Sequence, residues 1–447
     1  MNKHIRELPE ITFLYDLSLI TKRVNLEIMR ELLNSLGNPH IDGVKYVHVA
    51  GTNGKGSVCA SVYAVLRERY HVGLYLSPHV YRFNERIIVD DEEIEDEYIV
   101  NFVKEVRTIL EEIAKKGRRP SFFEVTTAMA FQYFKEKKCD FSVIEVGLGG
   151  RLDPTNVIHP LVSAVTSIDL EHTHILGDTV EKIAFEKAGI IKPHIPVVSG
   201  VKNERAIKII RDIAKKRKAP FYDALSEYEV YDVNIGLDGM KFKVLGGYEE
   251  YKISFPLIGR HQINNVLIAL KILELLREKY RIERKDIESG LSRVKLPGRF
   301  EVKMKSPLLI FDIAHNPAAS KALVNTIREL KLENVTFLFS ILKDKDVNKI
   351  LENLSQVSDE IIITEINDER RRMPAEEIEK YARKYFRNIE VIKESRKALE
   401  HALEKSDVAI ATGSAYLLGE LEEHLHSLTE RSPYLSGEQV DINLEHH

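Results

Sequence analysis

The first part of the chain alternates short apolar runs with longer helical patterns. Apolar runs lie at 46–50, 72–76, 141–146 and 161–168, and an amphipathic stretch at 96–115 has the period of a helix. Short strands that alternate with helices are typical of a mostly parallel, doubly wound sheet. The pattern therefore predicts an α/β domain whose strands are buried between helices.

Two changes of pattern follow. Between Tyr222 and Phe255, closely spaced glycines interrupt short strand patterns, which predicts hairpins at the rim of the first domain and then a helix over 262–279. The breakers in Lys295-Leu-Pro-Gly298 end this part, and a new series of strands and helices begins after them. Its strands are expected at 308–313, 336–340, 360–364 and 408–411.

These boundaries predict two domains. A chain of 447 residues is longer than a single core usually supports, which is roughly 250–300 residues. We place a doubly wound α/β domain at 1–297 and a smaller, Rossmann-like α/β domain at 298–431. The tail at 432–447 has no apolar period, and its ending Leu444-Glu-His-His447 is typical of the remnant of an expression tag.

Composition narrows the class of protein. Lys and Arg number 65 against 69 Asp and Glu, so there is no basic excess of the kind that binds nucleic acid. No run approaches the roughly 20 apolar residues of a membrane span, and charges with Pro9 occupy the place where a signal peptide would be apolar. We therefore expect a cytoplasmic protein without nucleic-acid or membrane partners. Cys59 and Cys139 lack CxxC spacing and are expected to be buried free thiols.

A glycine-rich loop follows the first predicted strand and precedes a helix. Its residues are Gly51, Thr52, Asn53, Gly54, Lys55, Gly56 and Ser57. Glycines let backbone amides approach phosphate oxygens, the helix N-terminus adds partial positive charge, and Lys55 supplies a full charge. The spacing departs from GxxxxGK[ST], because Val49 stands at the first glycine position and Gly56 separates Lys55 from Ser57. A turn with an exposed lysine is the alternative, but the order of strand, loop and helix favours a P-loop for a nucleoside triphosphate.

Polar side chains follow three of the predicted strands: Ser77, Glu145 and His172. Ligands of parallel sheets gather at the carboxyl ends of the strands. Mg²⁺ prefers hard oxygen ligands, so Ser77 and Glu145 are candidates, while a histidine is a less usual third ligand. Each residue alone could serve only a turn or a strand end, yet together they favour a metal site beside the phosphate loop.

Two further segments are less decisive. The stretch from Gly147 to Asn156 is rich in glycine and polar groups and is expected to approach a ligand closely. Lys187 lies among acidic neighbours at helical spacing, which by itself favours a surface ion pair and a structural role.

The ordered motifs resemble those of the folylpolyglutamate synthase and dihydrofolate synthase family, which are relatives of the Mur ligases. The resemblance runs from about residue 40 to residue 420. It rests on His48-Val-Ala-Gly-Thr-Asn-Gly-Lys-Gly-Ser57, Ser77-Pro-His79, Glu145-Val-Gly-Leu-Gly-Gly150, Glu186-Lys-Ala-Gly189, His261-Gln-Ile-Asn-Asn265, Pro297-Gly-Arg299 and Asp312-Ile-Ala-His-Asn-Pro317. The spacing around Lys55 is the form of the loop that this family carries.

The resemblance implies an ATP-dependent ligase that adds L-glutamate to dihydropteroate, tetrahydrofolate or both. The carboxylate would form an acyl phosphate, and the products would be ADP, phosphate and an amide. ATP and two Mg²⁺ ions are the implied cofactors, with the metal at Ser77, Glu145 and His172. Lys187 matches a lysine that members carry as a carbamate, that is, carboxylated on its Nζ. Glutamate, ATP and a pterin acid are the expected partners, and we expect a monomer.

The resemblance also implies binding residues for the nucleotide and the two other substrates. Asn265 and Arg299 match residues that contact the adenine and phosphates, and Asp312 matches one near the ribose, so that ATP lies between the domains. The pterin segments are Ser121, Phe122, Phe123, Glu124, Leu152, Asp153 and Pro154, although the two phenylalanines could equally be core residues. In the second domain, His315 and Ser414 match positions implicated in glutamate placement and catalysis.

Other functions remain open at this point. A Mur-type cell-wall ligase would use the same chemistry on another carboxylate but usually carries a nucleotide-sugar domain before the loop strand, where about 45 residues stand here. A P-loop kinase or nucleotide-dependent regulatory module would explain 46–57 but not the motifs of the second domain. The identity of the pterin is also open, and related compounds such as a methanopterin are alternatives. The sequence Gly150-Arg-Leu-Asp153 favours the bifunctional bacterial members.

Overall fold

The structure is a computed structural model that describes residues 9–17, 26–41, 43–246 and 249–431. It divides into two compact units, Met1–Leu296 and Pro297–His447, one residue before the boundary expected from the sequence. The expected tail at 432–447, with its tag remnant, lies outside the described residues.

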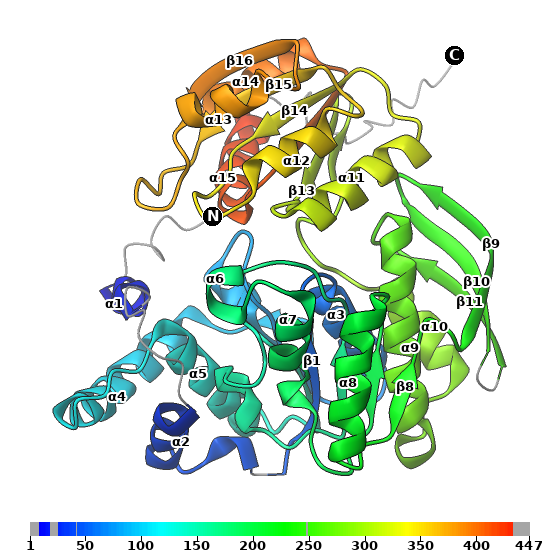
Figure 1. Ribbon diagram of the computed structural model, residues 1–447. Coiled ribbons are helices and arrows are strands. Elements are labelled where there is room, and N and C mark those ends of the chain that lie inside the picture. Colours follow the sequence, from blue (N-terminus) through cyan, green and yellow to red (C-terminus); the bar gives the residue numbers. More distant parts are fainter. Residues whose placement is uncertain (1–8, 18–25, 42, 247–248, 432–447) are drawn as a thin grey trace, which may run out of the picture. The chain divides into compact units, whose positions relative to one another are not determined.

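The first unit is built on an eight-stranded sheet (Figure 1). In spatial order its strands are β4 (Glu92–Glu93), β3 (Ile87–Val89), β2 (Val72–Tyr75), β5 (Phe141–Glu145), β1 (Lys45–Ala50), β6 (Val162–Val165), β7 (Val197–Ser199) and β8 (Phe221–Asp223). The six strands from β2 to β8 are parallel, and β3 and β4 extend the sheet as an antiparallel edge. The predicted doubly wound sheet is confirmed, but the run at 161–168 forms a shorter strand because its last residues turn toward the phosphate loop.

Alternate strand residues face opposite layers of helices. On one face Val47 and Val49 share a core with α3, α9 and α10, and on the other Tyr46 and Ile144 pack with α1, α2, α4 and α5. Val197 and its neighbours pack under α7 and α8. The helices are α1 (Pro9–Leu17), α2 (Leu26–Ser35), α3 (Lys55–Leu66), α4 (Asp96–Lys115), α5 (Phe122–Glu136), α6 (Thr173–Leu176), α7 (Val180–Lys187), α8 (Glu204–Lys216), α9 (Arg260–Tyr280) and α10 (Arg284–Ser292). Short 3-10 turns are η1 (Pro39–Ile41), η2 (Phe83–Arg86), η3 (Pro154–Val157) and η4 (Ala188–Ile190).

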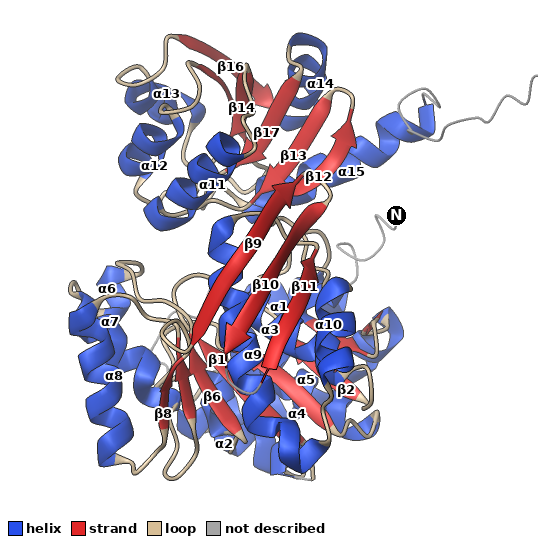
Figure 2. Cartoon of the chain, turned by 90° about the vertical axis from the view of Figure 1, so that its right-hand side faces the viewer, coloured by secondary structure: helices blue, strands red, loops and turns tan. Residues whose placement is uncertain are grey.

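A second, three-stranded sheet confirms the predicted hairpins. Its antiparallel strands are β9 (Tyr228–Gly236), β10 (Gly239–Gly246) and β11 (Glu249–Phe255), with β10 in the middle (Figure 2). The buried Glu274 of α9 accepts hydrogen bonds from the Tyr228 hydroxyl at 2.7 Å and the Tyr251 hydroxyl at 3.2 Å. A buried carboxylate is tolerated when it is well bonded, so this contact fastens the small sheet to α9.

The second unit contains a six-stranded sheet. Its spatial order is β12 (Glu301–Lys305), β13 (Leu308–Asp312), β17 (Val408–Thr412), β14 (Val335–Phe339), β15 (Glu360–Glu365) and β16 (Asn388–Glu394). Only the edge strand β12 is antiparallel to its neighbour. The helices of this unit are α11 (Pro317–Glu329), α12 (Val347–Leu354), α13 (Ala375–Ala382), α14 (Ser395–Lys405) and α15 (Ala415–Arg431).

Two expectations from composition can be compared with the structure. Cys59 and Cys139 are both buried and free, as predicted. Within the described part of the chain, no helix combines the length and the apolar character needed to cross a bilayer.

Candidate active site

The phosphate loop joins the end of β1 to the start of α3. Gly54 caps the helix with φ 84°, a left-handed conformation that glycine adopts without strain. A Cβ atom at Gly54 would lie 2.3 Å from Oδ1 of Asn265. At Gly51, a Cβ atom would lie 1.9 Å from Oγ1 of Thr166. The structure therefore places Asn265, on α9, directly against the loop, and glycine is required at both loop positions by close contacts.

The segment after β6 holds the loop in place. Thr166 Oγ1 donates a hydrogen bond to the Asn53 carbonyl at 2.6 Å, and the Asn53 amide donates to Ser167 Oγ at 2.9 Å. The Thr52 amide donates to the Ser167 carbonyl at 2.8 Å, and Asp169 donates from its amide to Thr52 Oγ1 at 3.1 Å. The sequence analysis missed Thr166 and Ser167, although their position at the carboxyl end of a parallel strand was a signal for them.

Lys55, Ser77 and Glu145 lie together beside the loop. Lys55 Nζ is 3.9 Å from Glu145 Oε1 and donates to the Thr52 carbonyl at 3.2 Å. The other carboxylate oxygen of Glu145 accepts a hydrogen bond from the Ser77 amide at 3.0 Å. A buried carboxylate, Glu145, and a half-buried cation, Lys55, thus lie together at the carboxyl ends of the parallel strands.

The side chains of this group fit a hard divalent cation. Ser77 Oγ is buried and has no hydrogen-bond partner among the described residues. A buried hydroxyl without a partner is costly, and a cation that accepts its lone pair would remove that cost. Hydroxyl and carboxylate oxygens are ligands that Mg²⁺ prefers, so Ser77 and Glu145 could hold such an ion together with oxygens of a bound phosphate. Among the described residues, no group of three or more His, Cys, Asp or Glu side chains is arranged to hold a metal.

His172 occupies the start of the short helix α6. It has a left-handed backbone, with φ 49°, and its Nε2 lies 4.0 Å from Glu171 Oε1. The ring centroid of His174 lies 6.3 Å from that of His172. His172 therefore lies at the turn that begins α6, in agreement with the alternative of a turn residue.

Lys187 is buried at the end of α7 and is not a surface residue. Only 5% of it is exposed, and its Nζ donates a hydrogen bond to the Gly51 carbonyl at 2.7 Å. Burial, followed by the nearby charge of Lys55, lowers the pKa of Lys187 to about 7. The surface ion pair favoured by helical spacing is wrong, because α7 turns this residue inward toward the phosphate loop.

The first predicted pterin segment begins α5, and it touches the loop that leads to the second. Ser121 caps α5 and donates from its amide to Glu124 Oε2 at 2.7 Å, which gives both residues a role in helix capping. The ring of Phe123 lies against Gly147, where a Cβ atom would come within 2.1 Å of it. Phe122 stacks on Tyr15 with ring centroids 5.7 Å apart and packs against the core.

The second of these segments is held by Asp153, which is buried. Its Oδ2 accepts a hydrogen bond from the Leu148 amide at 2.9 Å, and its Oδ1 accepts one from the Thr155 amide at 3.0 Å. Burial raises the pKa of Asp153. Leu152 is partly exposed beside it, and Pro154 begins η3. The carboxylate therefore closes the loop on itself.

In the second unit, the predicted residues gather at the carboxyl ends of β13 and β17. Asp312 Oδ2 accepts a hydrogen bond from the Phe300 amide at 2.9 Å, and burial raises its pKa to about 6. His315 Nδ1 lies 2.9 Å from the Ile313 carbonyl, and Arg299 Nη1 donates to the Gly298 carbonyl at 3.1 Å. Asp312 pairs with Thr412 in register, and Ser414 lies two residues beyond the end of β17.

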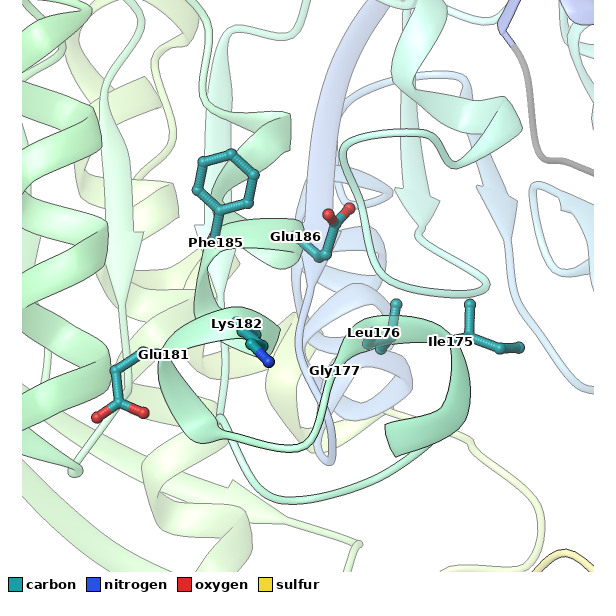
Figure 3. Close-up of a pocket in the computed structure, with 7 residues that line it drawn as sticks. All are labelled: Ile175, Leu176, Gly177, Glu181, Lys182, Phe185 and Glu186. Carbon is teal, nitrogen blue, oxygen red and sulfur yellow. The ribbon is translucent and has the colours of Figure 1, made fainter.

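In the first unit, a pocket of about 430 Å³ lies between α6 and α7, next to His172 and Lys187 in the chain (Figure 3). Its apolar side chains include Ile175 and Phe185, which are 54% and 50% exposed. Its charged side chains are already paired: Lys182 with Asp178 at 2.8 Å, Glu186 with Arg151 at 2.8 Å and Glu181 with Arg205 at 3.3 Å. The pocket therefore lacks free groups for phosphoryl chemistry.

Comparison with known proteins shows the family of the chain. The family described as Mur ligase middle domain matches residues 49–273, half of the chain, and the Mur ligase, glutamate ligase domain matches residues 298–415. A dihydrofolate synthase/folylpolyglutamate synthase of Bacillus subtilis is 33% identical over 412 residues, 89% of this chain and 94% of that protein. The chain belongs to the folylpolyglutamate synthase/dihydrofolate synthase family of Mur ligases.

Other members of the folylpolyglutamate synthase family show the same relation. A probable bifunctional folylpolyglutamate synthase/dihydropteroate synthase of Haloferax volcanii is 37% identical over 78% of this chain, and the match spans 42% of that longer protein. The structure of Mycobacterium tuberculosis folylpolyglutamate synthase complexed with ADP superposes with a TM-score of 0.84 at 29% identity, covering 93% of this chain and 98% of that one. The chain is therefore a ligase with the fold of this family.

Proposed function

We propose that this protein joins L-glutamate to dihydropteroate, to tetrahydrofolate or to both, at the expense of ATP. The observation that carries the proposal is the meeting of Lys55, Glu145 and Lys187 at one glycine-rich loop, which combines a phosphate site with buried ionisable groups. The names of its relatives support the choice of glutamate and a folate-type acceptor.

A carboxylate does not condense with an amine directly, because hydroxide is a poor leaving group. In the proposed reaction, an acceptor carboxylate oxygen attacks the γ-phosphorus of ATP, the bond to ADP breaks, and an acyl phosphate forms. The glutamate amine then attacks the acyl carbon, loses a proton, and expels phosphate. The loop amides and the Lys55 ammonium offset the negative charge of the transferring phosphoryl group.

Mg²⁺ is proposed at Ser77 and Glu145, with a second ion near His172 and Lys187. When bound, such ions neutralise phosphate charge and hold oxygens in line. The unpartnered hydroxyl of Ser77 supports the first position. Asn265 is proposed to contact the nucleotide, because it already lies against the loop at Gly54.

Carboxylation of Lys187 is the second part of the proposal. Its neutral amine would attack CO2, forming an N–C bond and releasing a proton, and a cation would become an anion. A pKa of about 7 supports this, because near pH 7 about half of the amine is in the reactive neutral form. The carbamate oxygens would then orient the second ion or the acceptor carboxylate.

The remaining predicted residues have proposed roles as well. Phe123 and the loop around Asp153 would shape the pterin pocket, since Phe123 lies against Gly147 at the start of that loop. In the second unit, His315 and Ser414 are proposed to place glutamate, with Arg299 and Asp312 contacting the nucleotide. We propose a monomer as the working unit, which light scattering on the purified protein would test.

One assay tests the reaction. Purified protein is incubated with MgATP and labelled glutamate, with dihydropteroate, tetrahydrofolate or no acceptor, and both ADP and products are measured, the latter by mass spectrometry. A product one glutamate heavier with either pterin supports the ligase and identifies its acceptor. ADP release that ignores both acceptor and glutamate would overturn the proposal in favour of a nucleotide-dependent regulatory module.

A further inference from the structure

A buried chain of hydrogen bonds connects β1, the strand before the phosphate loop, to the loop at 147–156. His48 lies on β1, three residues before Gly51, and is fully buried. Its Nε2 is 2.8 Å from Thr155 Oγ1, and that hydroxyl donates a hydrogen bond to Asp153 Oδ1. None of these contacts takes part in the chemistry proposed above for the phosphoryl group.

The direction of the hydrogen bonds follows from the partners. The Thr155 hydroxyl has one proton and gives it to the Asp153 carboxylate, so it must accept from His48 Nε2. Nδ1 of His48 then carries a lone pair, and among the described residues it has no partner. Burial lowers the pKa of His48 to about 3, so the ring is neutral, as this arrangement requires.

The far end of the chain of bonds controls a loop that touches several parts of the site. Asp153 Oδ2 binds the Leu148 amide at 2.9 Å, three residues after Glu145. The Arg151 amide donates to the Glu186 carbonyl at 2.7 Å, next to Lys187. The same loop packs through Gly147 on Phe123. The loop thus follows directly after β5, bonds to the end of α7 beside Lys187 and packs on the ring of Phe123.

We infer that His48 and Thr155 are positioning residues that fix the 147–156 loop to the phosphate-loop strand and so align the acceptor carboxylate with the γ-phosphate. Asp153 then acts through the loop, because both its oxygens are occupied by protein donors. The inference rests on the proposed function. The ligand is the same pterin-bearing carboxylic acid, and His48 and Thr155 are the residues that determine its position.

The variant Thr155→Val tests the inference, because it keeps the shape of threonine and removes the hydroxyl. Loss of one buried hydrogen bond is expected to raise KM for the acceptor about tenfold while KM for ATP changes less than about twofold. When the acceptor is misplaced, water hydrolyses part of the acyl phosphate before glutamate can attack it. The ratio of ADP to glutamylated product is therefore expected to rise above that of the wild type. Thr155→Ser keeps the hydroxyl and is expected to stay close to wild type.

Two further variants separate positioning from stability. His48→Leu removes the donor at the other end and is expected to shift the acceptor KM in the same direction. Thr326→Val removes a buried hydroxyl of α11 that binds the Ala322 carbonyl at 2.9 Å, and it should affect thermal stability only. Histidine ¹⁵N spectra of the wild type should show His48 as a neutral ring protonated on Nε2 between about pH 5 and pH 9.

The outcomes distinguish the inference from the proposed function. A wild type without pterin-dependent ADP release overturns both. An active wild type with Thr155→Val indistinguishable from it overturns the inference alone, as does an equal rise of both KM values. If neither Thr155→Val nor His48→Leu folds, the hydrogen bonds support the fold and not the acceptor, which also overturns it. A selective rise of the acceptor KM that Thr155→Ser avoids supports it.

Discussion

Lys187 Nζ donates a hydrogen bond to the carbonyl oxygen of Gly51 at 2.7 Å. This bond joins the last residue of α7 to the first residue of the phosphate loop. A carbamate keeps one N–H on the same nitrogen, so carboxylation of Lys187 is compatible with the bond, while the new oxygens extend the side chain as an anion. The position therefore suits a lysine whose charge is reversed in use.

Lys187→Ala is expected to lower ligation about 100-fold, because the anion that orients metal or acceptor is lost. A short carboxylate such as acetate should restore part of the activity by occupying the vacated space. ADP release with and without acetate measures this. Lys182→Ala is the matched control, since Lys182 lies on the same helix but on the surface, paired with Asp178. Full activity of Lys187→Ala without any additive would contradict the carbamate.

Stability should depend on pH through Lys187. In the fold its pKa is about 7, against an ordinary value of 10.5 in the unfolded chain. Between these values the unfolded lysine keeps a proton that the folded one has lost, so the free energy of unfolding rises with pH across this window, by roughly 2–5 kcal/mol. Urea titrations from pH 7 to 10 in CO2-free buffer measure the slope. Lys187→Met should remove most of it, and an unchanged slope would refute the assignment.

Ser77→Ala should weaken Mg²⁺ dependence without harming the fold. Its buried hydroxyl has no protein partner, so its removal should leave the melting temperature unchanged or raise it, while the Mg²⁺ concentration for half-maximal activity rises about tenfold. Ser142→Ala is the control, because its hydroxyl is equally buried and unpartnered among the described residues but faces Gly73. Equal Mg²⁺ curves for both variants would exclude Ser77 as a ligand.

Gly54→Ala should impair nucleotide binding. A methyl group there would lie 2.3 Å from Asn265 Oδ1, and φ is 84°, so the loop must move. We expect KM for ATP to rise at least about tenfold, as measured by initial rates. Gly37→Ala isolates the backbone effect, since Gly37 has φ 75° but nothing within 4 Å of the added atom. That variant should lose about 1 kcal/mol of stability and keep its ATP kinetics.

Much of the fold could be predicted from the sequence, because strand length and helical period are local properties. The buried runs became β1, β2, β5 and β13 with ends within about a residue of those expected, and the hairpins followed the glycines. The antiparallel edge formed by β3 and β4 was missed, since strands of two or three residues carry almost no periodic signal.

Less of the candidate site could be predicted from local sequence patterns. Lys187 was expected on the surface because its neighbours at helical spacing are acidic, whereas the direction in which α7 faces depends on how it packs on the sheet. Family resemblance corrected that expectation by naming the position. No pattern along the chain could have paired His48 with Thr155, which lies 107 residues away, because only the folded sheet brings them together.

The phosphate loop also has a consequence for the order in which the protein is made. Its supports are encoded late: Thr166 lies 113 residues beyond Asn53, and Asn265 belongs to α9. A nascent chain on the ribosome therefore carries the nucleotide-binding motif long before it carries the residues that shape it. A fragment that ends before β6 would therefore contain the whole motif yet lack the hydrogen-bond partners that hold it in place.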